Sequence, residues 1–210
     1  MTCRLYASLL AAIRFSRSSQ FTRGAFFCFR LPGGGYYFLP RFWCPDDADK
    51  ARQAANKAQL RPWVLGGHIK ATLSNTTDYD VIEQDVIADA DKFQPLQIAY
   101  DPWNATQVVT HLQKSGWKMI EFGQTIKNYT APMKEFEKLV KARQARHGGN
   151  PAMRFCIKNV MVQRDSNANE RPTKGKSADK IDGATAALMA LGIGMTSDAT
   201  GWYDPSMLRG

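Results

Sequence analysis

The sequence predicts one α/β domain in which a mixed sheet carries helices on both of its faces. The first observation is an aromatic-rich stretch at 36–43 that follows the turn Pro32-Gly33-Gly34-Gly35, as in antiparallel strands joined by tight turns. The second is the order strand, helix, strand over residues 95–122, which is the pattern of a βαβ unit with a parallel strand pair. Antiparallel strands followed by alternating strands and helices indicate a mixed sheet.

The first half of the chain is expected to supply strands and one helix. Residues 1–30 show no clean hydrophobic period, and the stretch 14–20, rich in Arg and Ser, is typical of a solvated loop. Asp46 or Asp47 can cap a helix that is rich in Ala and Lys and ends near residue 59. The expected strands are at residues 24–29, 36–43 and 64–73.

The second half is expected to alternate strands and helices and to end in a helix. Asp78 or Asp80, and then Asn104, can cap helices, and Gly116 can stop the second of them. Pro132 fits the first turn of a longer helix. The expected helices are at 79–91, 105–115, 132–146 and 179–191, the strands at 95–100, 118–122 and within 155–163, and a polar loop at 165–176.

Composition and charge limit the class of protein. The 210 residues are enough for one domain with a proper core, and 44% hydrophobic with 22% charged residues is ordinary for a globular protein. The net charge of +9 lies mostly in residues 1–45, which contain six Arg and no Asp or Glu. The rest of the chain is only weakly basic, so the charge alone does not indicate a nucleic-acid surface on the folded body.

The cysteines and the hydropathy indicate a cytoplasmic protein. No two of the four cysteines have CxxC spacing and none lies near a His at ligand spacing, so neither a zinc site nor a disulfide framework is expected. No run reaches the roughly 18 apolar residues that a membrane span needs. We therefore expect reduced thiols and no membrane partner.

Two carboxylates stand where a metal-dependent phosphodiesterase would need them. Asp101 follows the apolar residues 98–100, as at the carboxyl end of a buried strand, where ligands bind in α/β sheets. Asp182 lies in the first turn of a small-residue helix, and Gly183 beside it allows a close approach of the backbone. Divalent cations held by such carboxylates neutralise a phosphate and activate water, and Lys174 can contact the scissile phosphate.

Each of these residues also has a plainer interpretation. Asp101 before Pro102 can simply form a turn, and Asp182 can be a favourable charge at a helix N-terminus. Asp165 can bind metal, directly or through another ligand, or it can be a turn residue. The basic residues within 134–146 can contact DNA phosphates or form a solvated helix face.

Several segments occur in an order that is typical of a known family. The segments are Gly34-Gly35-Tyr36-Tyr37-Phe38-Leu39-Pro40-Arg41-Phe42-Trp43, Ala99-Tyr100-Asp101-Pro102-Trp103, His147-Gly148-Gly149-Asn150-Pro151 with Asn159, then Asp165, Asn169, Pro172 and Lys174, and Lys180-Ile181-Asp182-Gly183. Over residues 33–192 the chain resembles the nuclease domain of a tailed-phage terminase large subunit.

The resemblance implies a fold, a chemistry and a set of partners. It implies an RNase H-like fold, Mg²⁺ or Mn²⁺ as cofactor, and cleavage of double-stranded DNA during genome packaging in the cytoplasm of a bacterial host. It further implies metal binding by Asp101, Asp182 and Asp165, catalysis by Asp101, Asp182 and Lys174, and the portal and the small terminase subunit as partners.

The sequence departs from this family in two ways. No G-x-x-x-x-G-K-[ST] motif occurs, so no ATP site is expected in this chain. The family carries a metal-binding Asp on its first strand, whereas residues 5–30 contain no acid. We therefore expect a defective first strand, impaired cleavage, a non-matching Arg-rich head at 1–32 that need not fold, and a loosely ordered tail at 193–210. A divergent or frameshifted N-terminus would explain the head.

Two other functions stay open. The chain can be a catalytically inactive prophage remnant that binds DNA or packaging partners, or another RNase H-like enzyme such as a resolvase or transposase domain. Metal-dependent cleavage separates the nuclease from the remnant, and a preference for branched DNA would favour the resolvase.

Overall fold

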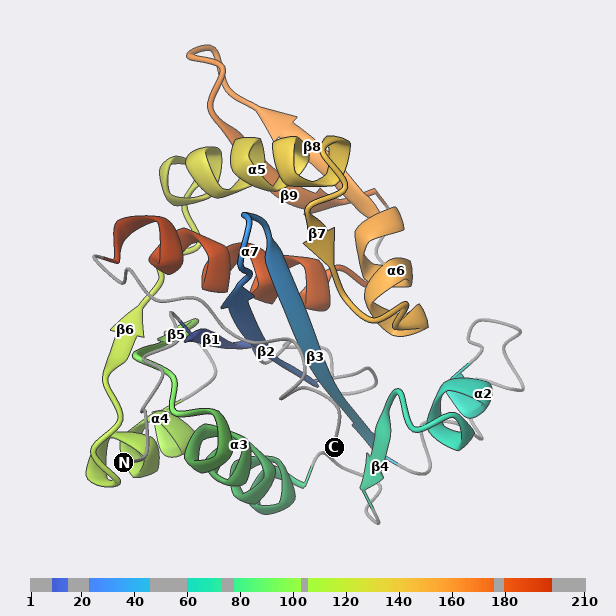
Figure 1. The fold of residues 1–210 in the computed structure, drawn as a ribbon, viewed down its shortest axis with the longest axis vertical. Coiled ribbons are helices and arrows are strands. Elements are labelled where there is room, and N and C mark those ends of the chain that lie inside the picture. The colour runs from blue at the N-terminus through green and yellow to red at the C-terminus, as the bar shows by residue number, and fades with distance from the viewer. Residues whose placement is uncertain are drawn as a thin grey trace.

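A seven-stranded mixed sheet forms the centre of the protein (Figure 1). The computed structural model describes residues 9–14, 23–45, 60–72, 78–102, 106–175 and 180–197. In their order across the sheet the strands are β4 (Lys70–Thr72), β3 (Tyr36–Pro45), β2 (Arg23–Arg30), β1 (Leu9–Arg14), β5 (Gln97–Tyr100) and β6 (Met119–Glu121), and β7 (Ala145–Arg146) pairs with β3 beside this path.

The sheet is mixed because its strands are connected in two different ways. β1, β2 and β3 form an antiparallel meander, whereas β1, β5 and β6 run parallel to one another. The predicted βαβ unit is present, since the helix α4 (Thr106–Lys114) lies between the parallel strands β5 and β6 in the chain. The mixed α/β sheet that the sequence predicts is thereby confirmed.

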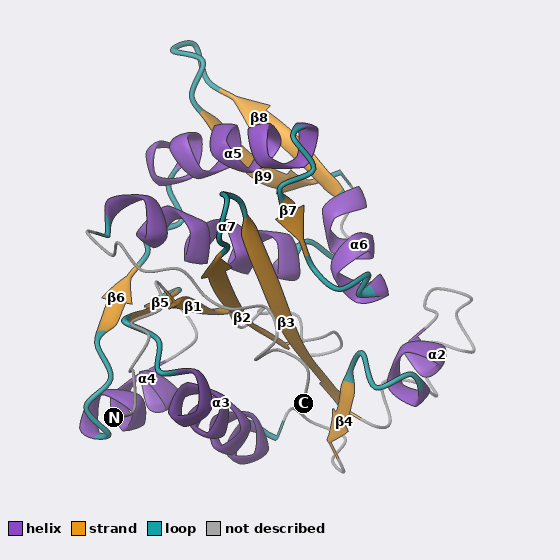
Figure 2. Cartoon of the chain, in the orientation of Figure 1, coloured by secondary structure: helices purple, strands orange, loops and turns teal. Residues whose placement is uncertain are grey.

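Helices cover both faces of this sheet (Figure 2). The other described helices are α2 (Leu60–Leu65), α3 (Tyr79–Phe93), α5 (Ile126–Lys141), α6 (Pro151–Lys158) and α7 (Asp182–Thr196), and a separate hairpin consists of β8 (Val160–Arg164) and β9 (Glu170–Lys174). α3 and α4 pack on one face, and α7 packs on the other. α5 and α6 pack on α7, and β9 packs on α5. Among the described helices, none has the length and apolar character that crossing a membrane requires.

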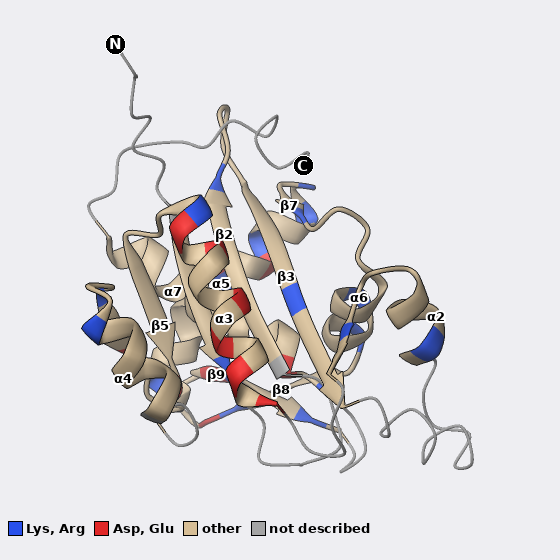
Figure 3. Ribbon diagram, turned by 90° about the horizontal axis from the view of Figure 1, so that it is seen from below, with Lys and Arg blue, Asp and Glu red and all other residues tan. Residues whose placement is uncertain are grey.

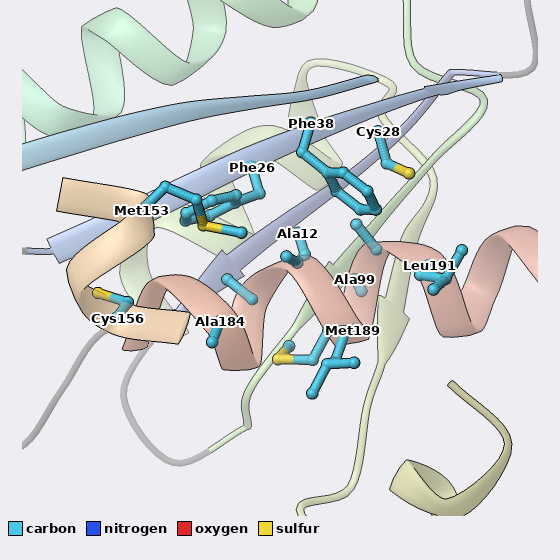
Figure 4. Close-up of a cluster of buried hydrophobic side chains, with 14 of the residues drawn as sticks. Ala12, Phe26, Cys28, Phe38, Ala99, Met153, Cys156, Ala184, Met189 and Leu191 are labelled. Carbon is cyan, nitrogen blue, oxygen red and sulfur yellow. The ribbon is translucent and has the colours of Figure 1, made fainter. Parts of the chain in front are cut away.

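Strand alternation divides the core into two layers. Successive side chains of a strand point to opposite faces of the sheet. Leu10 and Ala12 of β1 therefore pack toward α7, whereas Ala11 and Ile13 pack toward α3 and α4. Figure 4 shows the layer between the sheet and α7. By the same alternation, the side chain of Arg14 at the end of β1 lies on the α7 side.

α7 lies directly on the sheet because its residues there are small. A Cβ atom on Gly183 would lie 2.7 Å from Cζ of Phe42, and one on Gly194 would lie 2.5 Å from Cδ1 of Leu10. Real Cβ atoms do not approach so closely, so these positions favour glycine. Gly194 lies over the start of β1 and Asp182 lies beside its last residue. α7 therefore runs antiparallel to β1 and begins at its carboxyl end.

Several sequence predictions of local structure are confirmed, with ends shifted by a few residues. The strands expected at 24–29, 36–43, 95–100 and 118–122 are β2, β3, β5 and β6. The side chain of Asp78 caps α3 by accepting a hydrogen bond from the backbone N–H of Val81 at 3.1 Å. The described cysteines, Cys28, Cys44 and Cys156, are buried free thiols.

The long helix begins earlier than predicted. α5 begins at Ile126, where the side chain of Thr125 accepts a hydrogen bond from the N–H of Asn128, and Pro132 lies inside the helix. Proline in a helix interior removes one backbone hydrogen bond. Packing opposes this cost, because Pro132 is buried so close to α7 that a Cβ on Gly192 would lie 2.9 Å from its Cγ. The helix prediction was wrong here because it followed local preference and not burial.

Three further segments differ from the predictions. The segment 155–163, expected to form strands, begins inside α6, and only 160–164 form a strand. Asn150 caps α6, and Pro151 takes its first position. The segment 64–73 begins in α2 and reaches only the three-residue strand β4. The polar loop expected at 165–176 contains the turn and the second strand of the β8–β9 hairpin.

The residues expected to form a non-matching head supply two strands of the central sheet. β1 and β2 both lie within 1–32, and β1 pairs with β2 on one side and with β5 on the other. Leu10 to Ile13 are buried, so β1 takes its place in the sheet without any acidic residue. At the other end, α7 extends to Thr196, into the expected tail. The helix expected at 46–59, the Asn104 cap and residues 198–210 lie outside the described residues.

Candidate active site at the ends of β1, β5 and α7

Three charged side chains meet where β1 and β5 end and α7 begins. The parallel register pairs Ile13 with Tyr100, so the next residues, Arg14 and Asp101, lie side by side. Alternation turns both side chains toward α7, whose first residue is Asp182. The predicted meeting of Asp101 and Asp182 at one site is thus present in the structure, with Arg14 as a third member.

The guanidinium of Arg14 lies between the two carboxylates. Its Nη1 is 3.5 Å from Oδ2 of Asp101, and its Nε is 3.5 Å from Oδ1 of Asp182. The side chains of Asp101 and Asp182 are only 7% and 3% exposed, and that of Arg14 is 20% exposed. Buried carboxylates are costly unless a positive charge compensates them, and Arg14 supplies that charge here.

Two neutral side chains hold the guanidinium in place. Nη1 of Arg14 donates a hydrogen bond to Oε1 of Gln124, and the hydroxyl of Tyr129 donates to the same oxygen at 2.6 Å. Gln124 is itself fixed by its Nε2, which donates to the carbonyl oxygen of Phe122 at 3.0 Å. Burial raises the pKa of Tyr129 well above its usual value, so the phenol stays protonated and remains a donor.

The cluster leaves two polar atoms without a hydrogen-bond partner among the described residues. They are Nε of Arg14 and Oδ2 of Asp182, and both are buried. Close to Asp182, burial raises the pKa of the Cys156 thiol to about 12, so this thiol is neutral. The site therefore holds two carboxylates with the guanidinium of Arg14 between them.

These residues do not fit a divalent cation while Arg14 lies between them. A two-metal site needs several carboxylates or other oxygen ligands. Within the described part of the chain, no three His, Cys, Asp or Glu residues come together to form such a group. A divalent ion about 4 Å from a guanidinium is repelled by about 8 kcal/mol at an effective dielectric constant near 20. Metal binding would require Arg14 to leave the pair.

The other two predicted site residues lie on the β8–β9 hairpin. Asp165 follows β8 at the turn, where its oxygens accept hydrogen bonds from the backbone N–H groups of Asn167 and Asn169 and from the side chain of Asn169, all at 2.9 Å. These hydrogen bonds lower the pKa of Asp165. The structure does not bring Asp165 into one cluster with Asp101 and Asp182. Lys174 is the exposed last residue of β9.

The sequence interpretation missed Arg14, Gln124 and Tyr129. One signal was available for Arg14. Residues 9–13 are apolar and end in a charged residue, the same form as 98–100 followed by Asp101. No local signal marks Gln124 or Tyr129, because they join the site through the placement of α5 against α7.

Several other charged groups in the described part of the chain form pairs. Figure 3 shows acidic residues gathered on α3. Among them, Asp89 accepts two hydrogen bonds from Arg41 of β3, at 2.6 and 2.9 Å. On α5, Nζ of Lys138 lies 3.3 Å from Glu135, which favours the solvated-face interpretation of this helix. Nζ of Lys141 likewise lies 2.6 Å from Glu137.

Comparison with known proteins identifies the class to which this fold and site belong. The model of the family "Terminase large subunit, endonuclease domain" matches residues 12–198. The chain belongs to this family, as its sequence resemblance predicted. The match begins inside β1, so it includes most of the stretch that was expected not to match.

Two known proteins show how this chain relates to longer ones. It is 27% identical over 180 residues to the large terminase subunit of Enterobacteria phage HK97, covering 84% of this chain and 36% of that protein. It is 31% identical over 167 residues to protein YmfN of Escherichia coli K12, covering 76% of this chain and 36% of that protein. The chain thus spans about a third of the length of these curated relatives.

Solved structures show the same fold. The crystal structure of the HK97 large terminase matches 89% of this chain and 39% of that chain, with a TM-score of 0.80 and 24% identity. The large terminase nuclease of thermophilic phage G20c with bound magnesium matches 88% of this chain and 80% of that chain, with a TM-score of 0.51 and 9% identity. These neighbours confirm the predicted RNase H-like fold.

Proposed function

We propose that this chain binds double-stranded DNA as the nuclease domain of a phage packaging protein, and that its metal-dependent cleavage is impaired. The family supports the substrate and the packaging context. One observation supports the impairment: Arg14 lies between Asp101 and Asp182, where a further carboxylate is needed. Mg²⁺ or Mn²⁺, when bound by such a nuclease, neutralises the phosphate and activates water.

The size of the impairment follows from what the site lacks. Both carboxylates contact the guanidinium of Arg14, so a divalent ion cannot take the position between them while Arg14 stays there. Removing one strongly acting catalytic group commonly reduces the rate by a factor on the order of 10² to 10⁴. We expect a deficit of at least about 10² relative to an intact terminase nuclease domain.

Lys174 is proposed as a contact to a DNA phosphate. It is exposed at the end of β9, on a hairpin that projects beyond α5 in Figure 1. Asp165 is proposed to shape the turn of that hairpin, because three N–H donors already occupy its oxygens. The portal, the small terminase subunit and the cytoplasm of the bacterial host remain predictions for the longer packaging protein.

Two assays on the purified chain test this proposal. Fluorescence anisotropy with a labelled duplex should show salt-dependent binding, and Lys174→Ala should weaken it at every duplex sequence. Nicking of supercoiled plasmid in Mn²⁺ should be at least about 10²-fold slower than with an intact terminase nuclease domain. Equal nicking rates would contradict the impairment, and an absence of duplex binding would contradict the substrate.

A second candidate is a DNA-binding or packaging-partner protein without any catalysis. The burial of Asp101 and Asp182 against Arg14 favours it, because the guanidinium lies between the two carboxylates where a metal ion would have to bind. Duplex binding combined with no nicking in Mg²⁺ or Mn²⁺ at any concentration would select this candidate.

A further inference from the structure

We infer that the guanidinium of Arg14 takes the place of a divalent cation at the Asp101–Asp182 pair, and that residue 14 decides whether this pair binds metal. This inference deepens the proposed function, because it names the group that fills the site. Its test needs neither DNA nor cleavage.

The first step is the placement of the guanidinium. Arg14 ends β1, its backbone lies beside Asp101 through the parallel register, and its side chain points toward the start of α7. Both carboxylates lie 3.5 Å from it, one from Nη1 and one from Nε. A group that touches both carboxylates at once occupies the space in which a bridging cation would have to lie.

The second step is that this position is built and is not a chance surface contact. Nη1 of Arg14 donates to Gln124, Tyr129 donates to the same Gln124 oxygen, and Gln124 is tied to the backbone at Phe122. These residues follow β6 or belong to α5, so elements outside β1, β5 and α7 also hold the guanidinium. The side chain cannot leave without breaking this network.

The third step concerns charge. Asp101 and Asp182 are buried, and Oδ2 of Asp182 lacks a hydrogen-bond partner among the described residues. Without Arg14, the two buried carboxylates would lose the cation that lies between them, and a metal ion could take its place. An Arg14→Ala chain should therefore depend on metal for its stability, and an Arg14→Asp chain should bind metal more tightly through a third carboxylate.

Metal titration of the full chain tests the inference. Mn²⁺ binding is measured by calorimetry and by the loss of free Mn²⁺ signal in electron paramagnetic resonance, for wild type, Asp101→Asn and Arg14→Asp. Wild type and Asp101→Asn should behave alike, and Arg14→Asp should bind Mn²⁺ at least about 100-fold more tightly than wild type. Mn²⁺ binding by wild type that Asp101→Asn abolishes would overturn the inference.

Thermal unfolding provides the second measurement. In the presence of a chelator, the Arg14→Ala variant should unfold at a lower temperature than wild type. Mn²⁺ at about 100 times its dissociation constant for the variant should raise the variant's unfolding midpoint by roughly 5–10 °C. Wild type should not respond to Mn²⁺. Arg41→Ala is the matched control, because it removes an arginine of β3 that pairs with Asp89 of α3, away from the candidate site. Mn²⁺ should not raise the unfolding midpoint of this variant. A rescue of Arg41→Ala equal to that of Arg14→Ala would overturn the inference.

Failure of the inference and failure of the proposed function give different results. If wild type binds Mn²⁺ through Asp101 but nicks plasmid slowly, the inference is wrong and the impaired nuclease stands. If wild type shows no binding that depends on Asp101 but nicks as fast as an intact domain, the inference stands and the proposed function is wrong.

Discussion

Replacing Gly183 by Ala should loosen α7 on the sheet and lower the stability of the whole domain. A Cβ atom at this position would lie 2.7 Å from Cζ and 3.0 Å from Cε1 of Phe42, and 3.1 Å from Sγ of Cys156. Carbon atoms in favourable contact are about 3.5–4.0 Å apart. The ring of Phe42 has little freedom to turn away, because it packs edge-on against Phe26 with the centroids 5.4 Å apart. The start of α7 must therefore move outward.

The size of the effect is a difference between two contributions. Overpacking a tight core costs about 1–3 kcal/mol. Alanine in a helix recovers at most about 1 kcal/mol relative to glycine. A net loss of about 1–2 kcal/mol corresponds to a decrease of roughly 2–8 °C in the unfolding midpoint of a chain of this length.

Urea and thermal unfolding of a double-mutant cycle measure this loss. The second change is Phe42→Leu, which removes the ring atoms that the new Cβ would meet. In that background Gly183→Ala should be nearly neutral, so the two changes should couple by about 1 kcal/mol or more. The reasoning is refuted if Gly183→Ala is as stable as wild type, or if it costs the same amount with and without the Phe42 ring.

Three further predictions concern contacts away from the site. The backbone N–H of Glu170 donates to the hydroxyl of Thr130 at 2.9 Å, and Thr130→Val removes this acceptor. Hydrogen exchange of β9 should therefore accelerate, while that of α3 is unchanged. Trp43→Phe removes the 2.7 Å hydrogen bond from Nε1 to Asp85 and should cost about 2 kcal/mol in urea unfolding, whereas no loss would show that water replaces it. Burial lowers the pKa of His147 below its usual 6.5, so the unfolded chain binds the proton more readily and stability should fall as the pH drops through this value. His147→Gln should flatten that decrease between pH 7 and pH 5, and an unchanged slope in urea midpoints would contradict the assignment.

Local signals were enough to predict much of the fold. Asp78 marks the start of α3 by its own side chain, and the alternation of strand and helix over residues 95–122 is complete within one short stretch. Asp101 and Asp182 were predicted to meet, because the carboxyl ends of parallel strands and the start of the helix that covers them lie at one edge of a sheet.

The features that the sequence did not predict depend on distant partners. β1 was missed because its short apolar run becomes a strand only between β2 and β5, and residue 14 was taken for part of a solvated loop. Pro132 was placed at the start of α5 by its usual preference, whereas contact with α7 keeps it inside the helix. In both places tertiary packing overrode the local preference of the residues.

The order in which Arg14, Asp101 and Asp182 occur along the chain has a consequence for how the protein acquires its site. The three residues are spread over most of the sequence, and none of them is near another in the chain. The cluster can therefore form only after residue 182 has left the ribosome and the chain has closed its long-range contacts, which are the slow events of folding. A nascent chain arrested before α7 emerges would contain the strands of the sheet but no assembled charge cluster.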